Sequence, residues 1–124
     1  MEIPNPITLG PCTLYLGDCY DLLSVQRADL LLTDPPYGIG RDGRPKSTSS
    51  HGGHKGYEFR GWDDEPPTSE QFMALFKSAT DYVIWGANYF APNMKRGPGW
   101  LFWDKGQRID QADGELAASS RTGA

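Results

Sequence analysis

The sequence predicts an α/β domain in which a mostly parallel sheet carries helices on both faces. Short apolar runs, typical of buried strands, alternate with segments of helical periodicity. One of these runs, Leu30-Leu31-Leu32, is apolar on both faces, as expected of a central parallel strand. Two prolines stop that run where a glycine-rich stretch begins. The 124 residues are enough for one domain with a modest core.

Composition narrows the class of protein. A hydrophobic content of 38% and a charged content of 23% are ordinary for a globular domain, and no apolar run is long enough to span a membrane. The start, "MEIPNPITLG", lacks the basic and apolar regions of a secretory signal. We therefore expect a cytoplasmic protein without a membrane partner, in which Cys12 and Cys19 are thiols.

The first elements are short. Residues 13–16 are apolar between two turn signals and predict a strand. Asp18 then provides an acidic cap for a helix that extends to about Gln26. The leucine run at 30–32 predicts the next strand, and it ends at Asp34.

The second half begins with residues 38–61, where seven glycines and a serine cluster predict a long loop. Thr68 precedes a helix predicted over 69–80, because apolar residues recur there at helical spacing. Strands are predicted at 82–85, 99–106 and about 115–119. Ligands bind beyond the carboxyl ends of the strands in such sheets, so Asp18, the turn at 34–37 and the turn at 86–88 mark the expected site.

The stretch "TDPPYGIGRDG" contains two signatures. Gly38, Gly40 and Gly43 have the spacing G-x-G-x-x-G, which holds a dinucleotide pyrophosphate when a helix follows. Here Arg44 and Pro45 lead into a serine and glycine run instead, so we interpret the spacing as chance. A nucleotide-dependent oxidoreductase is the corresponding minor hypothesis.

The second signature, Asp-Pro-Pro-Tyr at 34–37, suits recognition of a planar amino group. Asp34 provides a carboxylate that accepts hydrogens from an exocyclic nitrogen and so favours its attack on an electrophile. Pro35 and Pro36 fix a rigid turn whose carbonyls are free to accept, with Pro35 as the expected second acceptor. Tyr37 offers a ring on which an extruded base can stack. The bland interpretation is a proline turn with a capping Asp and a core Tyr.

Charge is unevenly distributed along the chain. Residues 38–60 have a net charge of +3 within a protein of net charge −4. A basic loop on an acidic body predicts contact with nucleic-acid phosphates, although a solvated loop has the same composition. The candidate DNA-binding residues are Arg41, Arg44, Lys46, Lys55 and Arg60.

The chain resembles the DNA amino-methyltransferases that use S-adenosyl-L-methionine, as found in phage and bacterial DNA methylation and restriction-modification systems. The stretches that carry the resemblance lie within residues 13–120: "LYLGDCYDLL", "DLLLTDPPYGIG", "VIWGANYF" and "GWLFWDKG". It implies a Rossmann-like methyltransferase domain in which the catalytic motif precedes the cofactor motif. The reaction it implies is methyl transfer to adenine N6 in preference to cytosine N4.

Carried over to this sequence, the resemblance implies that Asp34, Pro35 and Tyr37 form the target-base pocket and that Pro36 shapes its turn. Asp18 lies near the adenosine part of the cofactor, with Cys19 beside it. The loop at 38–61 faces DNA.

One feature of the family is missing. Its F-x-G-x-G cofactor stretch does not occur in the sequence, and in this arrangement it would follow residue 124. We therefore expect residues 1–124 to be the catalytic half of the domain, with weak or no cofactor binding and little or no activity alone. The expected partner is a missing C-terminal half or a second copy. The alternative is a catalytically incomplete fragment that acts at most as a nucleic-acid-binding remnant.

Other candidates for chemistry have simpler interpretations. His51 and His54 lie three apart in a glycine loop without an acidic or cysteine cluster, so no metal site is predicted. The acidic residues Asp63, Asp64 and Glu65 are interpreted as a solvated turn. Trp85 and Trp103 lie in predicted strands and are expected in the core.

Overall fold

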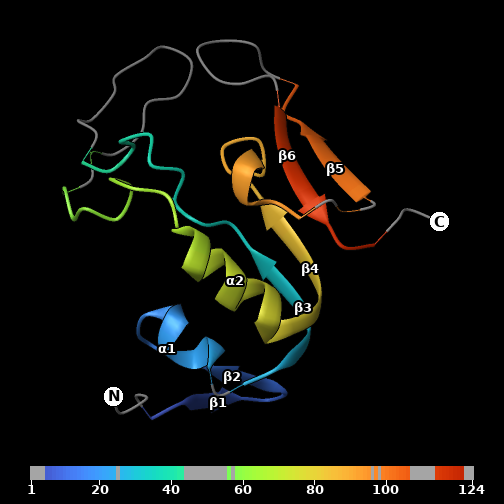
Figure 1. The fold of residues 1–124 in the computed structure, drawn as a ribbon. Helices are drawn as coiled ribbons and strands as arrows, with labels where there is room; N and C mark the ends of the chain where they lie inside the picture. Colours follow the sequence, from blue (N-terminus) through green and yellow to red (C-terminus); the bar gives the residue numbers. More distant parts are fainter. Residues whose placement is uncertain are drawn as a thin grey trace.

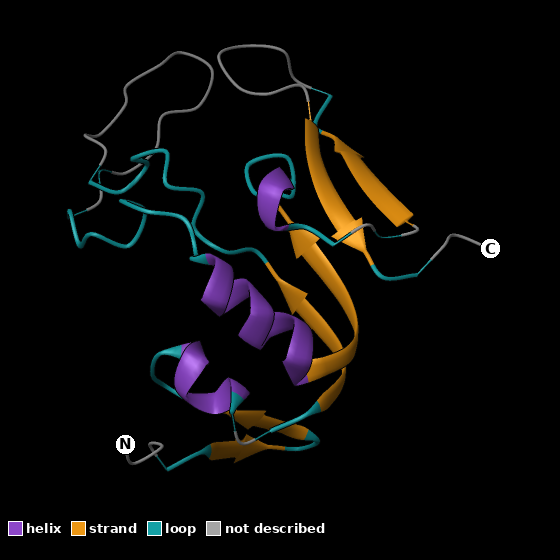
Figure 2. Cartoon of the chain, viewed as in Figure 1, coloured by secondary structure: helices purple, strands orange, loops and turns teal. Residues whose placement is uncertain are grey.

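A mixed four-stranded sheet forms the centre of the computed structural model (Figures 1 and 2). The structure describes residues 5–24, 26–43, 56, 58–95, 97, 99–106 and 114–121. The longer of two helices lies against the sheet, the shorter helix packs against the longer one, and a separate two-stranded hairpin precedes both in the chain. The fold is therefore a mixed α/β arrangement.

The hairpin consists of β1 (Ile7–Leu9) and β2 (Cys12–Leu14), which pair antiparallel. A two-residue turn joins them, and Gly10 takes a positive φ of 58° that such a turn requires. The sequence prediction of a strand at 13–16 was wrong in its bounds, and β1 was not predicted. Both strands are exposed, so burial leaves no strong apolar pattern in the sequence.

The first helix, α1 (Cys19–Leu23), begins at the predicted cap. The Asp18 carboxylate accepts a hydrogen bond from the backbone N–H of Tyr20 at 3.0 Å. The helix ends at Leu23, before the predicted end near Gln26. Tyr20 and Leu23 pack against the hydrophobic core.

β3 (Ala28–Thr33) and β4 (Ala79–Trp85) pair in parallel within the sheet. Ala28 lies opposite Ala79 and Thr33 lies opposite Ile84, so the two strands end at nearly the same level. This shared edge positions the residues that follow each strand.

The longer helix, α2 (Ser69–Ser78), confirms the predicted helix and leads into β4. Thr68 and Gln71 form a capping box in which each side chain accepts the backbone N–H of the other. Its apolar face buries against β3 and β4. The core cluster consists of Phe72, Leu75, Phe76, Ile84 and Phe90.

The sheet is completed by a reversed pair. After the short 3-10 helix η1 (Ala91–Asn93) come β5 (Gly99–Asp104) and β6 (Gly114–Ser119), which pair antiparallel. β6 lies between β4 and β5 and runs antiparallel to both, giving the order β3-β4-β6-β5. The prediction of a mostly parallel sheet is therefore corrected to a mixed sheet with one parallel pair.

The position of β3 also differs from the prediction. β3 is an edge strand of the four-stranded sheet rather than a central one. Leu31 packs against the core, whereas Leu30 and Leu32 remain 52% and 66% exposed. Among the described residues, α1 and α2 lie on one side of the sheet and no helix covers the other (Figure 1). The leucine run is thus apolar on both faces although only one face is covered.

The two tryptophans that were expected in the core differ in environment. Trp85 is half-buried in β4, whereas Trp103 in β5 is 55% exposed, so its assignment to the core was wrong. Within the described ranges, no helix is long and apolar enough to cross a membrane.

We expect Ile84→Val to lower the free energy of unfolding by about 0.5 to 1.5 kcal/mol, because Ile84 is fully buried and the lost methylene leaves a small cavity. Ile7→Val is the matched control, since Ile7 is 63% exposed in β1 and the same change should cost less than about 0.5 kcal/mol. Urea unfolding followed by circular dichroism measures both. Equal losses would contradict the assignment of the core.

Candidate functional site

A cleft of about 460 Å³ opens at the end of β3, where the chain turns at Asp34. Its volume is in the range of small-molecule sites. One wall comes from the start of α1 and from the turn after β3, and the other comes from the approach to α2. The lining residues include Cys19, Asp34, Pro35 and Pro36 on the first wall, and Glu65, Pro66, Pro67, Thr68 and Gln71 on the second.

The cleft brings together residues that the sequence had placed in two different roles. Asp34, Pro35 and Pro36 belong to the predicted base pocket, and Cys19 to the predicted cofactor site. Asp18 is outside the lining, and its carboxylate caps α1 instead. Pro35 is buried and Asp34 is exposed, so the rigid part of the turn is anchored while the carboxylate is accessible.

Tyr37 holds the Asp34 carboxylate in place. Its hydroxyl donates a hydrogen bond to Oδ1 of Asp34 at 2.5 Å. Oδ2 accepts no hydrogen bond from the residues that the structure describes. Partial burial, followed by this hydrogen bond and the charge of Asp34, raises the pKa of Tyr37 well above its usual range. Tyr37 is therefore a neutral donor at physiological pH, and one carboxylate oxygen is left to accept from a ligand.

The ring of Tyr37 is itself packed between aromatic neighbours that follow β4. It stacks on Tyr89 with ring centroids 4.6 Å apart and an interplanar angle of 15°. Phe90 contacts it edge-on at 5.8 Å, and Phe90 is part of the core cluster. The predicted base-stacking residue therefore has one face occupied by Tyr89. Sequence reasoning did not assign a role to Tyr89 or Phe90.

Gly86 provides the space for this packing. It follows β4 with a φ of +74°, and a Cβ on it would collide with the Tyr37 ring. The predicted site turn at 86–88 is thus next to the turn at 34–37, as expected for the ends of two parallel strands.

The α1 wall contributes a thiol of low reactivity. Partial burial, and secondly the charge of Asp18, raises the pKa of the Cys19 thiol. Partial burial, then the charge of Cys19 and lastly that of Asp18, raise the pKa of the neighbouring Tyr20 to about 12. Both side chains are neutral at physiological pH.

The second wall was not predicted. The acidic turn at 63–65 had been interpreted as solvated, but Asp63 is only 2% exposed and Glu65 lines the cleft. Only Asp64 and Glu65 are exposed as expected. Among the described residues that line the cleft, Asp34 and Glu65 are charged and none is basic. The cleft is therefore suited to a ligand that carries a positive charge.

Two of the predicted DNA-binding residues lie near this cleft in the chain. Arg41 and Arg60 are exposed, and within the described residues the one ion pair of Arg60 is a long contact of 3.7 Å with Glu58. Such a solvated pair contributes little and leaves the guanidinium accessible. Arg44, Lys46 and Lys55 lie outside the described residues, as do His51 and His54. In the described ranges, no group of three or more potential metal ligands occurs.

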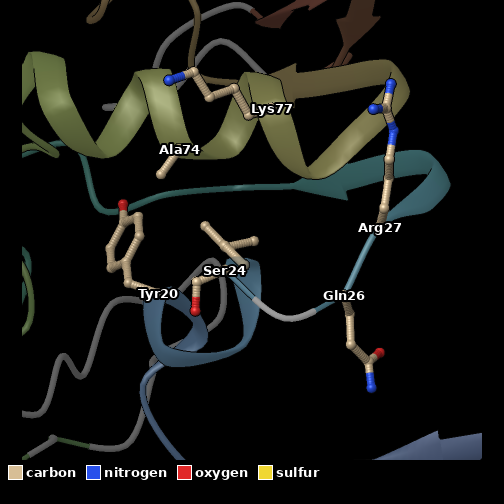
Figure 3. A pocket seen from close by; sticks show the side chains of 7 residues that line it. Tyr20, Ser24, Gln26, Arg27, Ala74 and Lys77 are labelled. Atoms are coloured by element: carbon tan, nitrogen blue, oxygen red, sulfur yellow. The ribbon is translucent and has the colours of Figure 1, made fainter.

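A second cavity of about 420 Å³ lies between α1 and α2 (Figure 3). Figure 3 shows that the side chains of Gln26 and Arg27 point in opposite directions and that Lys77 extends along α2. Gln26 donates a hydrogen bond to Tyr15 at 2.8 Å. Because its polar groups diverge, this cavity lacks the convergent groups of a binding site.

We expect Gly86→Ala to destabilise the protein more than Gly10→Ala. Both glycines have a positive φ, so both substitutions carry a backbone cost of about 1 to 2 kcal/mol. A Cβ at Gly10 meets nothing within 4 Å, whereas one at Gly86 overlaps the Tyr37 ring and should cost about 1 to 3 kcal/mol more. Urea unfolding measures the difference, and near-UV circular dichroism detects displacement of the ring. Equal losses would show that Tyr37 does not depend on Gly86.

Comparisons with known proteins identified no relative of the chain. A scan against protein-family models, a search of curated proteins and a search of solved structures each found no match to the chain. The functional interpretation therefore depends on the chemistry of the cleft and on the sequence resemblance.

Proposed function

We propose that the protein transfers a methyl group from S-adenosyl-L-methionine to an exocyclic amino group of a DNA base, adenine N6 in preference to cytosine N4. One observation carries the proposal. Cys19 from the predicted cofactor site and Asp34-Pro35-Pro36 from the predicted base pocket line the same cleft. A methyl donor and an acceptor nitrogen bound there would lie side by side.

The acceptor side of the cleft fits an amino group. The free Oδ2 of Asp34 is able to accept one N–H of the base, and the Pro35 carbonyl, in a segment without competing proline N–H groups, is the proposed acceptor of the other. Both contacts draw the nitrogen lone pair away from conjugation with the ring. As the new N–C bond forms, the nitrogen becomes positively charged, and Asp34 stabilises that charge and accepts the released proton.

The donor side fits a sulfonium. S-adenosyl-L-methionine supplies an electrophilic methyl group on a positively charged sulfur, and transfer breaks the S–CH₃ bond and leaves a neutral thioether. The described residues of the lining include two carboxylates and no basic side chain, which favours a cation. The neutral Cys19 and Tyr20 side chains add no opposing charge. Asp34 thus serves both the cation and the amino group.

The arrangement of the strands supports a proposal about the fold family. We propose that the chain is the catalytic half of a Rossmann-like methyltransferase domain. β3 and β4 are parallel neighbours and α2 leads into β4, so the turns after both strands meet at one edge, where ligands bind in such sheets. Arg41 and Arg60, exposed beyond that edge, are the proposed contacts to DNA phosphates.

We expect S-adenosyl-L-methionine at millimolar concentration to slow alkylation of Cys19 and to leave Cys12 unchanged. Both thiols are exposed, but only Cys19 lines the cleft, so Cys12 is an internal control in every sample. Iodoacetamide labelling at a pH of about 8.5, where thiolate is available, is quantified by mass spectrometry of the two peptides. Equal rates with and without the cofactor would contradict binding of S-adenosyl-L-methionine beside Cys19 by residues 1–124 alone.

In a complete, active version of the domain, we expect Asp34→Asn to lower methyl incorporation into unmethylated DNA by about 10² to 10⁴-fold, because the proton acceptor is lost. Asp29→Asn removes the same charge from an exposed position in β3 and should leave the rate unchanged. Transfer of tritiated methyl groups over hours measures both rates. A retained rate in Asp34→Asn would exclude the proposed role. If the chain binds nucleic acid but neither transfers methyl groups nor shows protection of Cys19 by the cofactor, the noncatalytic remnant is favoured.

A further inference from the structure

Two buried carboxylates join the chain segments on either side of residues 44–57. We call residues 38–43 and 58–63 together the neck. Asp42 comes from the first segment and Asp63 from the second, and each accepts hydrogen bonds from backbone N–H groups of the other segment. The contacts are thus reciprocal, and they join residues that are 18 to 25 positions apart in the sequence.

Asp63 uses both of its oxygens. Oδ1 accepts from the N–H of Gly38 at 2.8 Å, and Oδ2 accepts from the N–H of Arg41 at 2.7 Å. The Asp63 carbonyl also accepts from Gly40 at 3.2 Å. At 2% exposure, Asp63 is shielded from water, so these bonds are costly to lose. Gly38 directly follows Tyr37, and Asp63 therefore fixes the exit of the base-pocket turn.

Asp42 uses one of its oxygens. Oδ2 accepts from the N–H groups of Arg60 at 2.7 Å and Trp62 at 3.1 Å, while Oδ1 is buried and has no hydrogen-bond partner among the described residues. Burial opposes the charged form, but donation from the backbone, first from Arg60 and then from Trp62, lowers the pKa of Asp42. Asp42 is therefore ionised at physiological pH.

The two carboxylates fix the backbone positions of two exposed arginines. The backbone N–H of Arg41 is bound by Asp63, and that of Arg60 is bound by Asp42. Both arginine side chains extend into solvent from these fixed points. The neck thus ties both positive charges to the turn that carries Asp34, the group that would contact the target base.

We propose that Asp42 and Asp63 are positioning residues that direct Arg41 and Arg60 onto the DNA phosphates flanking the target base. The inference rests on the proposed function. It assigns to two acidic residues a favourable effect on the binding of a polyanion. Without a positioning role, removal of either negative charge would strengthen the attraction to DNA.

A positioning role predicts weaker DNA binding when the negative charge is removed, whereas simple electrostatics predicts stronger binding. This difference allows a direct test. Asp63→Asn and Asp64→Asn each remove one negative charge from adjacent positions, but only Asp63 bonds the neck, whereas Asp64 is exposed. We expect Asp63→Asn to weaken binding to a duplex of about 20 base pairs roughly tenfold, with a plot of log affinity against log salt shallower by about 1 to 2. Asp64→Asn should bind at least as tightly as the wild type. Fluorescence anisotropy measures affinity, and near-UV circular dichroism confirms the fold.

Asp42 supplies a second, independent variant if Asp63→Asn fails to fold. Asp42→Ala removes the acceptor and should weaken DNA binding. Asp42→Asn should restore it, because its amide oxygen can occupy the position of Oδ2 and accept from the N–H groups of Arg60 and Trp62. Failure of this rescue, or unchanged binding by folded Asp63→Asn, would overturn the inference.

The double variant Arg41→Ala/Arg60→Ala separates this inference from the proposed function. Weakened binding by the arginine variant together with unchanged binding by Asp63→Asn would overturn only the positioning role. A wild-type chain that does not bind DNA would overturn both proposals, whereas equal binding without the two arginines would overturn only the positioning role. Weakened binding by the arginine variant and Asp63→Asn, but not by Asp64→Asn, would support both.

Discussion

The packing of the Tyr37 ring is the interaction on which the site depends. The ring lies on Tyr89 and Gly86 at the end of β4, and its hydroxyl orients Asp34 at the end of β3. Phe90 connects the same contact to the hydrophobic core. The orientation of the carboxylate is therefore tied to the stability of the sheet, because Tyr37 cannot turn away without breaking aromatic contacts. A polar site gains its rigidity here from apolar packing.

The sequence predicted elements whose signals are local. The Thr68 cap and the helical period of α2 lie within one stretch, and both were found as expected. The topology was less predictable. β3 has the apolar composition of a central strand, yet it is an edge strand with two exposed leucines. Apolar residues alternate and repeat in the same way whether or not another element covers them, so the pattern does not reveal which face is covered.

The site also combines residues with a local sequence signal and residues whose roles depend on distant contacts. Asp34, Pro35 and Pro36 were predicted because they are contiguous, and the structure places them together with Cys19. Glu65 and the buried Asp63 were missed, because an acidic turn has the composition of a solvated one. Their roles arise from contacts across more than twenty residues, which no local window contains. Burial of a charge can be recognised only when its distant hydrogen-bond donors are known.

The neck also has a consequence for how the protein can vary. It closes the stretch 44–57 with hydrogen bonds that belong entirely to residues on either side. Doubling the length of such a closed stretch costs only about 0.6 kcal/mol of chain entropy. Insertions and deletions there can accumulate in evolution, or be introduced by an engineer, without moving the cleft. The neck therefore separates the length of this stretch from the geometry of the turn at 34–37.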